Sequence, residues 1–383
     1  MEESATIKMA QMARDLAAQG HDVISLSLGE PDFDTPAHIK EAAKKALDEG
    51  YTKYTPVPGL VELRKAIQAK FSRDNGLEYG LNQIVVSNGA KQSIANICLS
   101  LLDEGDEVII LAPYWVSYSE IVKLAGGVPV LVSADIEKDY KASAEQIAAA
   151  ITSRTRVLLF SSPCNPTGSV YLKEELKAIA EVIARHEGIY IISDEIYEYI
   201  NFTGKHASIG AFEEVKDRTV TVNGFSKGFA MTGWRLGYAC APAPLREAMM
   251  KIHQYCMLCA PIMSQMAGIE ALKMGASAYE EMRQSYEQRR NLIVSRLNGM
   301  GLHCFNPGGA FCVFPEIRST GLSSKDFAIK LLEKKSVAVV PGSAFSSAGE
   351  GFVRCCYATA PELIAKAMDL MEEFVNEVRA AGA

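Results

Sequence analysis

The chain has 383 residues, of which 48% are hydrophobic, enough for two domains or for one large α/β domain with an appendage. Its formal charge of −7 argues against a nucleic-acid-binding or membrane-binding surface, so an anionic substrate must be attracted by a few local cations. The first twenty residues lack the basic and apolar regions of a signal peptide, and no run of about 18 apolar residues predicts a transmembrane helix.

Short apolar runs alternate with amphipathic helical patterns through the first two thirds of the chain. Residues 90–102 and 173–186 each place an apolar stripe at helical spacing, and a glycine follows each stripe. Apolar strands separated by helices indicate an α/β fold with a mostly parallel sheet covered on both faces, and a ligand is expected beyond the carboxyl ends of the strands. The predicted strands are 83–88, 107–112, 128–133, 156–161, 189–194 and 219–224.

The pattern changes after about residue 280. Residues 285–301 predict a long helix, 308–317 and 337–343 predict short strands, and 361–379 predict a final helix. These elements indicate a smaller α+β domain, with which we group the start of the chain. The predicted division assigns residues 1–32 and 283–383 to the small domain and residues 33–282 to the large domain.

Nine cysteines are scattered along the chain, mostly inside apolar runs. We interpret them as reduced thiols that pack as small hydrophobic side chains, which predicts a cytoplasmic protein. Cys256 and Cys259 form a CxxC pair, but no second pair completes a zinc site. Packing is therefore favoured over metal binding, and no metal is expected.

Several strand ends carry residues whose roles stay open when each is taken alone. Asp194 is either a structural carboxylate, in an ion pair or at a helix N-cap, or the partner of a protonated ring nitrogen. Asn165 stands in an Asn-Pro-Thr-Gly turn, and Trp115 is either a core aromatic or a stacking plate for a flat ligand. Gly89 and Ala90 form a tight strand-to-helix turn that is also suited to holding a phosphate, although neither GxGxxG nor a Walker A motif is present.

Taken together, these strand ends match the needs of pyridoxal phosphate. Its phosphate requires backbone amides, a hydroxyl and a guanidinium, which Ser226 and Arg235 help to supply. Its pyridine nitrogen requires a carboxylate and its aldehyde requires a lysine, for which Asp194 and Lys227 are the candidates. Its ring requires a stacking partner, and its phenolic oxygen requires an amide and a hydroxyl. These remaining roles fall to Trp115, Asn165 and Tyr197.

The chain resembles the fold-type I pyridoxal-phosphate-dependent aminotransferases of class I over essentially its whole length. The resemblance implies a large domain with a mostly parallel seven-stranded sheet covered by helices, and a smaller α+β domain. The motifs that carry it, in chain order, are "LSLGEPDFDTP", "YTKYTPVPGLVELRKAI", "APYWVSY", "SPCNPTG", "SDEIYE", "GFSKGFAMTGWRLGY" and "FVRCCYAT".

The resemblance assigns cofactor roles by position. Lys227 is similar to the Schiff-base lysine. Tyr54 is similar to a tyrosine that reaches the phosphate bound by the partner subunit, which implies a homodimer with shared sites. The ring-binding residues of the family match Asn165, Asp194 and Tyr197, and its phosphate-binding residues match Gly89, Ala90, Ser226 and Arg235.

Substrate roles also follow from the resemblance. Arg354 matches the arginine that binds the substrate α-carboxylate through a bidentate pair. Gly29 lies where the backbone of the family meets the same carboxylate. Trp115 and Asn165 are expected to touch the substrate as well as the cofactor.

Lys91 bears on the choice of amino acid. It is either a solvated lysine at a helix start or, with Thr6, a match to residues that hold the distal carboxylate in the aspartate branch of the family, which sometimes uses prephenate. Residues 1–202 are similar to that branch, whereas the chain from residue 224 onward is similar to bacterial aromatic or broad-specificity enzymes. The implied reaction transfers the amino group of an L-amino acid, with aspartate favoured, to 2-oxoglutarate by a ping-pong mechanism. An aromatic or broad-specificity aminotransferase is the alternative.

Two features depart from the family pattern. The N-terminal arm that precedes the Ser-Ala-Thr segment in the family is nearly absent, and Cys356 stands where a serine is commoner. On the same fold, a carbon–sulfur β-lyase or a cyclopropane-forming synthase would keep Lys227, Asp194 and Arg354. A non-enzymatic regulator would need a fused basic DNA-binding segment, and a nicotinamide dehydrogenase would need the GxGxxG motif.

Overall fold

A computed structural model describes residues 5–273, 275 and 279–382 of the chain. Its main sheet has seven strands, and β8 is antiparallel to both of its neighbours while all other pairs are parallel. The expected α/β architecture with a mostly parallel seven-stranded sheet is therefore confirmed. In spatial order the strands are β2 (Ile84–Ser87), β8 (Gly237–Cys240), β7 (Thr219–Gly224), β6 (Tyr190–Asp194), β5 (Thr155–Ser161), β3 (Glu107–Ala112) and β4 (Val128–Ser133).

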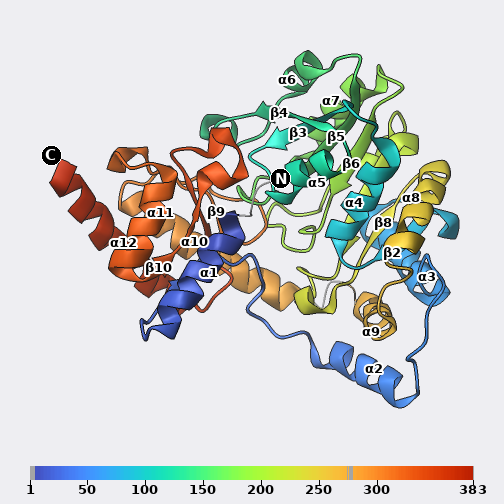
Figure 1. Cartoon of the computed structure of the whole chain (residues 1–383), viewed down its shortest axis with the longest axis horizontal. Coiled ribbons are helices and arrows are strands. Elements are labelled where there is room, and N and C mark those ends of the chain that lie inside the picture. Colours follow the sequence, from blue (N-terminus) through green and yellow to red (C-terminus); the bar gives the residue numbers. More distant parts are fainter. Residues whose placement is uncertain (1–4, 274, 276–278, 383) are drawn as a thin grey trace.

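Helices cover both faces of this sheet (Figure 1). On β3, Val108 and Ile110 pack into one hydrophobic cluster, whereas Ile109 and Leu111 pack into another, so successive side chains are buried on opposite faces. The first cluster includes α4 (Ala90–Leu101), α5 (Ser117–Leu124) and α8 (Ala243–Cys256), and the second includes α6 (Ala144–Ala150) and α7 (Lys173–Ala184). A third cluster packs α2 (Ala37–Asp48), α3 (Val61–Lys70) and α9 (Ile262–Lys273) against β2 and β8.

The two ends of the chain meet in a second body, on the left of Figure 1. Residues between Met9 and Leu26 share one hydrophobic core with residues between Met282 and Val375. A parallel pair joins β1 (Ile24–Ser25) to β10 (Val337–Ala338), and a three-stranded antiparallel sheet has the order β11 (Val340–Pro341), β12 (Val353–Cys356), β9 (Cys312–Val313). The helices are α1 (Ala5–Ala18), α10 (Glu280–Gly299), α11 (Ser324–Lys335) and α12 (Pro361–Gly382).

The proposed division at residues 32–33 and 282–283 remains a prediction, and α10 begins three residues before its second boundary. Residues 1–4 and 383 of the small domain lie outside the described residues. No helix in the described part of the chain is long and apolar enough to cross a membrane.

Three strand expectations differ in detail from the structure. The strand β8 was not among the six predicted runs, because its four residues lie within a glycine-rich motif and show no alternation. The run 337–343 forms two short strands, and these belong to different sheets. The run 308–317 contributes only β9, because it contains two glycines and a proline that interrupt pairing.

Candidate active site

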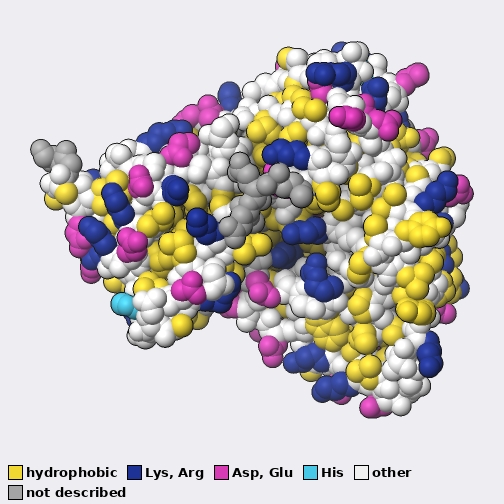
Figure 2. Space-filling view, viewed as in Figure 1, with side chains coloured by type: hydrophobic (Ala, Val, Ile, Leu, Met, Phe, Trp, Pro, Cys, Tyr) yellow, Lys and Arg dark blue, Asp and Glu magenta, His cyan; other side chains and the backbone are white. Residues whose placement is uncertain are grey.

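A cavity of about 450 Å³ lies at the carboxyl ends of the parallel strands, between the sheet and the second body. This volume is typical of small-molecule sites. Figure 2 shows basic side chains gathered around a hollow in the middle of the molecule. The predicted site residues that line the cavity are Thr6, Gly29, Ala90, Lys91, Trp115, Asn165, Asp194, Tyr197, Ser226, Lys227, Arg235 and Arg354.

Lys227 follows β7 and projects toward the second body. Its Nζ donates a hydrogen bond to the Gly29 carbonyl at 2.6 Å and lies 5.6 Å from the centre of the Phe311 ring. Burial, aided by the positive charge of Arg354, lowers the pKa of Lys227 to about 8, because a desolvated ammonium is disfavoured. The amine is therefore easier to deprotonate near neutral pH than an exposed lysine.

Asp194 ends β6 and is only 3% exposed. Its carboxylate accepts hydrogen bonds from the Tyr118 hydroxyl at 2.6 Å and from the Ile196 amide at 3.2 Å. Burial raises the pKa of Asp194 to about 6, and the hydrogen bonds from Tyr118 and Ile196 only partly oppose this shift. Among the described residues no cation forms an ion pair with it, so a positively charged ligand group would relieve the cost of its burial.

Arg354, on β12, is a buried cation at the opposite wall of the cavity, with 3% exposure. Its guanidinium donates to the Asn165 side-chain oxygen at 3.2 Å and to the Ser27 carbonyl at 2.6 Å, and its Nε has no partner. No carboxylate within the described ranges forms an ion pair with it. A buried, unpaired guanidinium of this kind is suited to a carboxylate ligand.

The start of α4 and the loop before β8 form another end of the cavity. Gly89 adopts a φ of +84°, and a Cβ there would lie 2.5 Å from Nη2 of Arg235. The glycine therefore leaves room for the guanidinium beside the first amides of α4, which have no partner within the helix. This arrangement of amides and a guanidinium fits a phosphate. Ala90 and Ser226 line the same cavity, whereas Gly89 forms its turn without reaching the surface of the cavity.

Lys91 is exposed at the rim, and its Nζ lies 4.9 Å from the centre of the Trp115 ring. Desolvation and the positive charge of Arg235 lower its pKa. Thr6, on α1, lines the same cavity from the second body. Two residues that are far apart in the sequence are thus brought to one opening.

Two residues behave differently from the rest. Tyr54 is 84% exposed and does not line the cavity of its own chain. Tyr118, in contrast, was not singled out from the sequence, although it touches Asp194. Its signal was the motif "APYWVSY", in which Tyr118 follows Trp115 by three residues. Tyr118 lies in the first turn of α5, and its ring contacts that of Trp115 edge-on, with ring centres 5.5 Å apart.

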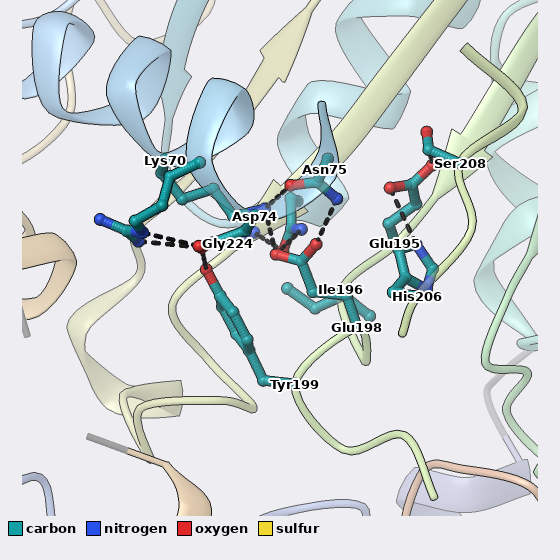
Figure 3. A network of polar contacts seen from close by, with 12 residues as sticks. Lys70, Asp74, Asn75, Glu195, Ile196, Glu198, Tyr199, His206, Ser208 and Gly224 are labelled. Atoms are coloured by element: carbon teal, nitrogen blue, oxygen red, sulfur yellow. Dashed lines mark hydrogen bonds and ion pairs between the residues drawn. The ribbon is translucent and has the colours of Figure 1, made fainter. Parts of the chain in front are cut away.

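Behind Asp194 lies a network of buried polar side chains, shown in Figure 3. Lys70 forms an ion pair with Glu198, which also accepts hydrogen bonds from Asn75 and Asn223 at 2.8 Å each. The network also includes Glu195, whose partners are His206 and two serine hydroxyls.

Ligand atoms of Glu195, Glu198 and His206 lie within 4.8 Å of one another, a spacing that also suits a metal ion. The partners of both carboxylates are protein groups, so we interpret the cluster as a structural network.

Comparisons with known proteins agree with this geometry. The family described as "Aminotransferase class I and II" matches residues 21–370. An aspartate aminotransferase of Pyrococcus abyssi is 48% identical, over 95% of this chain and 94% of that protein. The aromatic-amino-acid aminotransferase 2 of Thermococcus litoralis is 46% identical over the same shares. The crystal structure of an aspartate aminotransferase from Thermus thermophilus with maleate is 43% identical, covers 97% of each chain and has a TM-score of 0.93.

Proposed function

Because the chain belongs to the class I and II aminotransferase family and is a transaminase, we propose that it moves the amino group of an L-amino acid, with aspartate preferred, to 2-oxoglutarate. The observation that carries this proposal is the buried, unpaired guanidinium of Arg354, which shares one cavity with Lys227 and Asp194. A carboxylate held by Arg354 places the rest of an amino acid in the cavity that contains the Lys227 amine.

The residues of the cavity fit pyridoxal phosphate. Asp194 would hold its protonated ring nitrogen, and Asn165 with Tyr197 would meet its phenolic oxygen. The cup for its phosphate would be formed by Ala90, Ser226 and Arg235, with Gly89 leaving room behind them for the guanidinium, and the flat face of Trp115 would cover the ring. When bound, this cofactor supplies an aldehyde and a ring that withdraws electrons from the substrate α-carbon.

The chemistry of the chain itself is proton transfer by Lys227. With a pKa of about 8, its amine takes the α-proton of the amino acid and returns it as general acid. Arg354 orients the α-carboxylate, and the Gly29 backbone lies next to it, because a Cβ at Gly29 would be 3.9 Å from Nη1 of Arg354. The second half of a ping-pong cycle runs the same steps backward with 2-oxoglutarate.

The preference for aspartate is supported by the rim of the cavity. Lys91 and Thr6 line the same cavity, and Arg14 of α1 adds a further cation to its lining. These groups suit a distal carboxylate. Lys91→Met should lower kcat/KM for aspartate several-fold, since an exposed charge pair is worth about 0.2–1 kcal/mol, and should leave the value for phenylalanine unchanged. Lys173→Met, at an exposed position outside the cavity, is the control. An equal loss with both substrates would contradict the assignment of Lys91.

We further propose a cytoplasmic homodimer with shared sites. All nine cysteines are free thiols, which suits a reducing compartment. Tyr54 is exposed on its own chain, as is expected of a side chain that reaches the phosphate site of a partner. Sedimentation of the purified protein tests the dimer. Tyr54→Phe should weaken cofactor binding while the dimer stays intact.

The function is tested by half-reactions. Protein loaded with pyridoxal phosphate is mixed with single amino acids in the absence of any 2-oxo acid, and the absorbance of the lysine-bound cofactor is followed. Rapid loss with aspartate and glutamate supports the proposal. Loss with phenylalanine and tyrosine alone would favour the aromatic alternative, and release of pyruvate from cystathionine would favour the β-lyase.

A further inference from the structure

Two cysteines face each other across the sheet that carries Arg354. Cys312 on β9 and Cys356 on β12 are direct partners in the antiparallel register. The Cys356 amide donates to the Leu26 carbonyl at 2.8 Å, away from β9, so the two cysteines form a non-hydrogen-bonded pair. The Cα atoms of such a pair are about 4.5 Å apart, which is within the range that a disulfide spans.

The two thiols are in direct contact. Their sulfurs are 2.8 Å apart, closer than the about 3.5–4.0 Å at which even smaller carbon atoms pack. Both side chains are buried, at 0% and 2% exposure. All nine cysteines lie in the described part of the chain, and Cys312 with Cys356 is the one pair whose sulfurs touch. Simple packing of small apolar side chains explains the other thiols, but it does not require this contact.

The surroundings of the pair favour a thiolate. Arg354 precedes Cys356 by two residues and therefore projects from the same face of β12. Although burial alone would raise it, the pKa of Cys356 is lowered by the hydrogen bond from Cys312 and by the charges of Arg354 and Lys227. Burial raises the pKa of Cys312, which keeps its proton. One nucleophilic sulfur and one protonated partner are thus held together.

We propose that Cys312 and Cys356 form a reversible oxidation site, at which a peroxide links β9 to β12 through a disulfide beside Arg354. The thiolate sulfur of Cys356 attacks one oxygen of hydrogen peroxide, the O–O bond breaks, and hydroxide leaves and becomes water on protonation. The Cys312 sulfur then attacks the resulting sulfenic acid, its S–O bond breaks, and a second water leaves with the proton of Cys312. Starting from the Cys356 thiolate, the protein loses two electrons and the proton of Cys312. Hydrogen peroxide and one proton from solvent complete the two waters, and a dithiol reductant reverses the change.

The test uses cofactor-loaded protein and measures thiols rather than activity, so its outcome is independent of the proposed function. The protein is treated with hydrogen peroxide, remaining thiols are blocked, and the digest is analysed by mass spectrometry. We expect the nine free thiols to fall to seven, a linked peptide pair that contains Cys312 and Cys356, and recovery with dithiothreitol. The pair should react at least about tenfold faster than the buried single thiols Cys98 and Cys240.

Matched variants make the test specific. Cys356→Ser, which restores the side chain commoner at this position, and Cys312→Ser should each abolish the link. Cys355→Ser, at the adjacent position whose side chain projects to the other face of β12, should leave it intact. The proposal is overturned if peroxide links only Cys256 to Cys259, or if Cys356 is oxidised to a sulfinic acid without a link to Cys312.

Discussion

The segment from Asp194 to Glu198 separates two groups of charged side chains. In one group the charges form ion pairs within the protein, and in the other they do not. Behind the segment, Lys70 is paired with Glu198, and His206 with Glu195 (Figure 3). On the cavity side, Asp194 and Arg354 are buried and Lys227 is half-buried, and none of the three forms an ion pair within the described residues.

The comparison separates two uses of a buried charge. A paired group contributes to folding, and its loss leaves an uncompensated partner. An unpaired group costs free energy in the folded protein and gains its partner only from a ligand. Substitutions behind the segment should therefore affect stability, and substitutions in the cavity should affect activity.

The largest effect is expected for Lys227→Ala. Turnover should fall by more than about 1000-fold, because both the nucleophilic amine and the acid–base group are lost. The unfolding midpoint in urea should not fall. Activity assays and urea unfolding measure the two effects, with Lys173→Ala as an exposed control. Retained turnover would contradict the central role of this lysine.

Behind the segment, Lys70→Met should reduce the free energy of unfolding by about 3–5 kcal/mol, because Glu198 is left buried without a cation. The double variant Lys70→Met with Glu198→Gln should recover part of this loss, since no charge remains unpaired. Urea unfolding of all three proteins measures the difference. If the double variant is as unstable as the single one, the loss comes from packing and not from charge.

Arg354→Met provides the reciprocal case in the cavity. The value of kcat/KM for the amino acid should fall about 100-fold, which corresponds to about 3 kcal/mol for a truncated charge pair. Its unfolding free energy should change far less than that of Lys70→Met, because Arg354 has no ion pair to lose. Arg354→Lys keeps the charge without the bidentate geometry and should be intermediate in kcat/KM. A stability loss as large as that of Lys70→Met would break the comparison.

The smallest effect is expected for the pH dependence of the stability that the His206–Glu195 pair contributes. Burial alone would lower the pKa of His206, but the charge and hydrogen bond of Glu195 and the charge of Glu198 raise it overall, despite the opposing charge of Lys70. Burial alone would raise the pKa of Glu195, but His206, Ser208 and Lys70 lower it overall.

The contribution of His206 is complete below its unfolded pKa of about 6.5 and is lost as pH rises through the higher folded value. The contribution of Glu195 to stability is complete above its unfolded pKa of about 4.5 and is lost as pH falls through the lower folded pKa. The stability difference between wild type and His206→Gln should therefore be largest between about pH 4.5 and 6.5. A difference that is constant from pH 5 to pH 9 would contradict this assignment.

The charged residues of the cavity are easier to predict from the sequence than the buried ion pairs behind them. Asp194 is the last residue of β6 and Lys227 follows the end of β7 by three residues, so the common edge of a parallel sheet brings them together without further information. The pairing of Lys70 with Glu198 could not be predicted, because 127 residues lie between them and Lys70 has the ordinary appearance of a helical surface lysine.

The missed parts of the fold have the same cause. The hydrophobic pattern identifies β3 and β6, since each contains a run of consecutive apolar residues. The four residues of β8 form a strand because β2 and β7 lie on either side of them, which is tertiary information. Likewise, Cys312 and Cys356 lie in separate motifs, and only the register of β9 with β12 brings their sulfurs together.

The pairing of β1 with β10 has a consequence during synthesis on the ribosome. Ile24 pairs with Val337, which is translated roughly 15 to 60 s later at ~5–20 residues per second. Until then, Ile24 and Leu26 lack the partners that bury them in the finished protein. The nascent N-terminal segment therefore carries these apolar side chains without their final packing until residue 337 has been made.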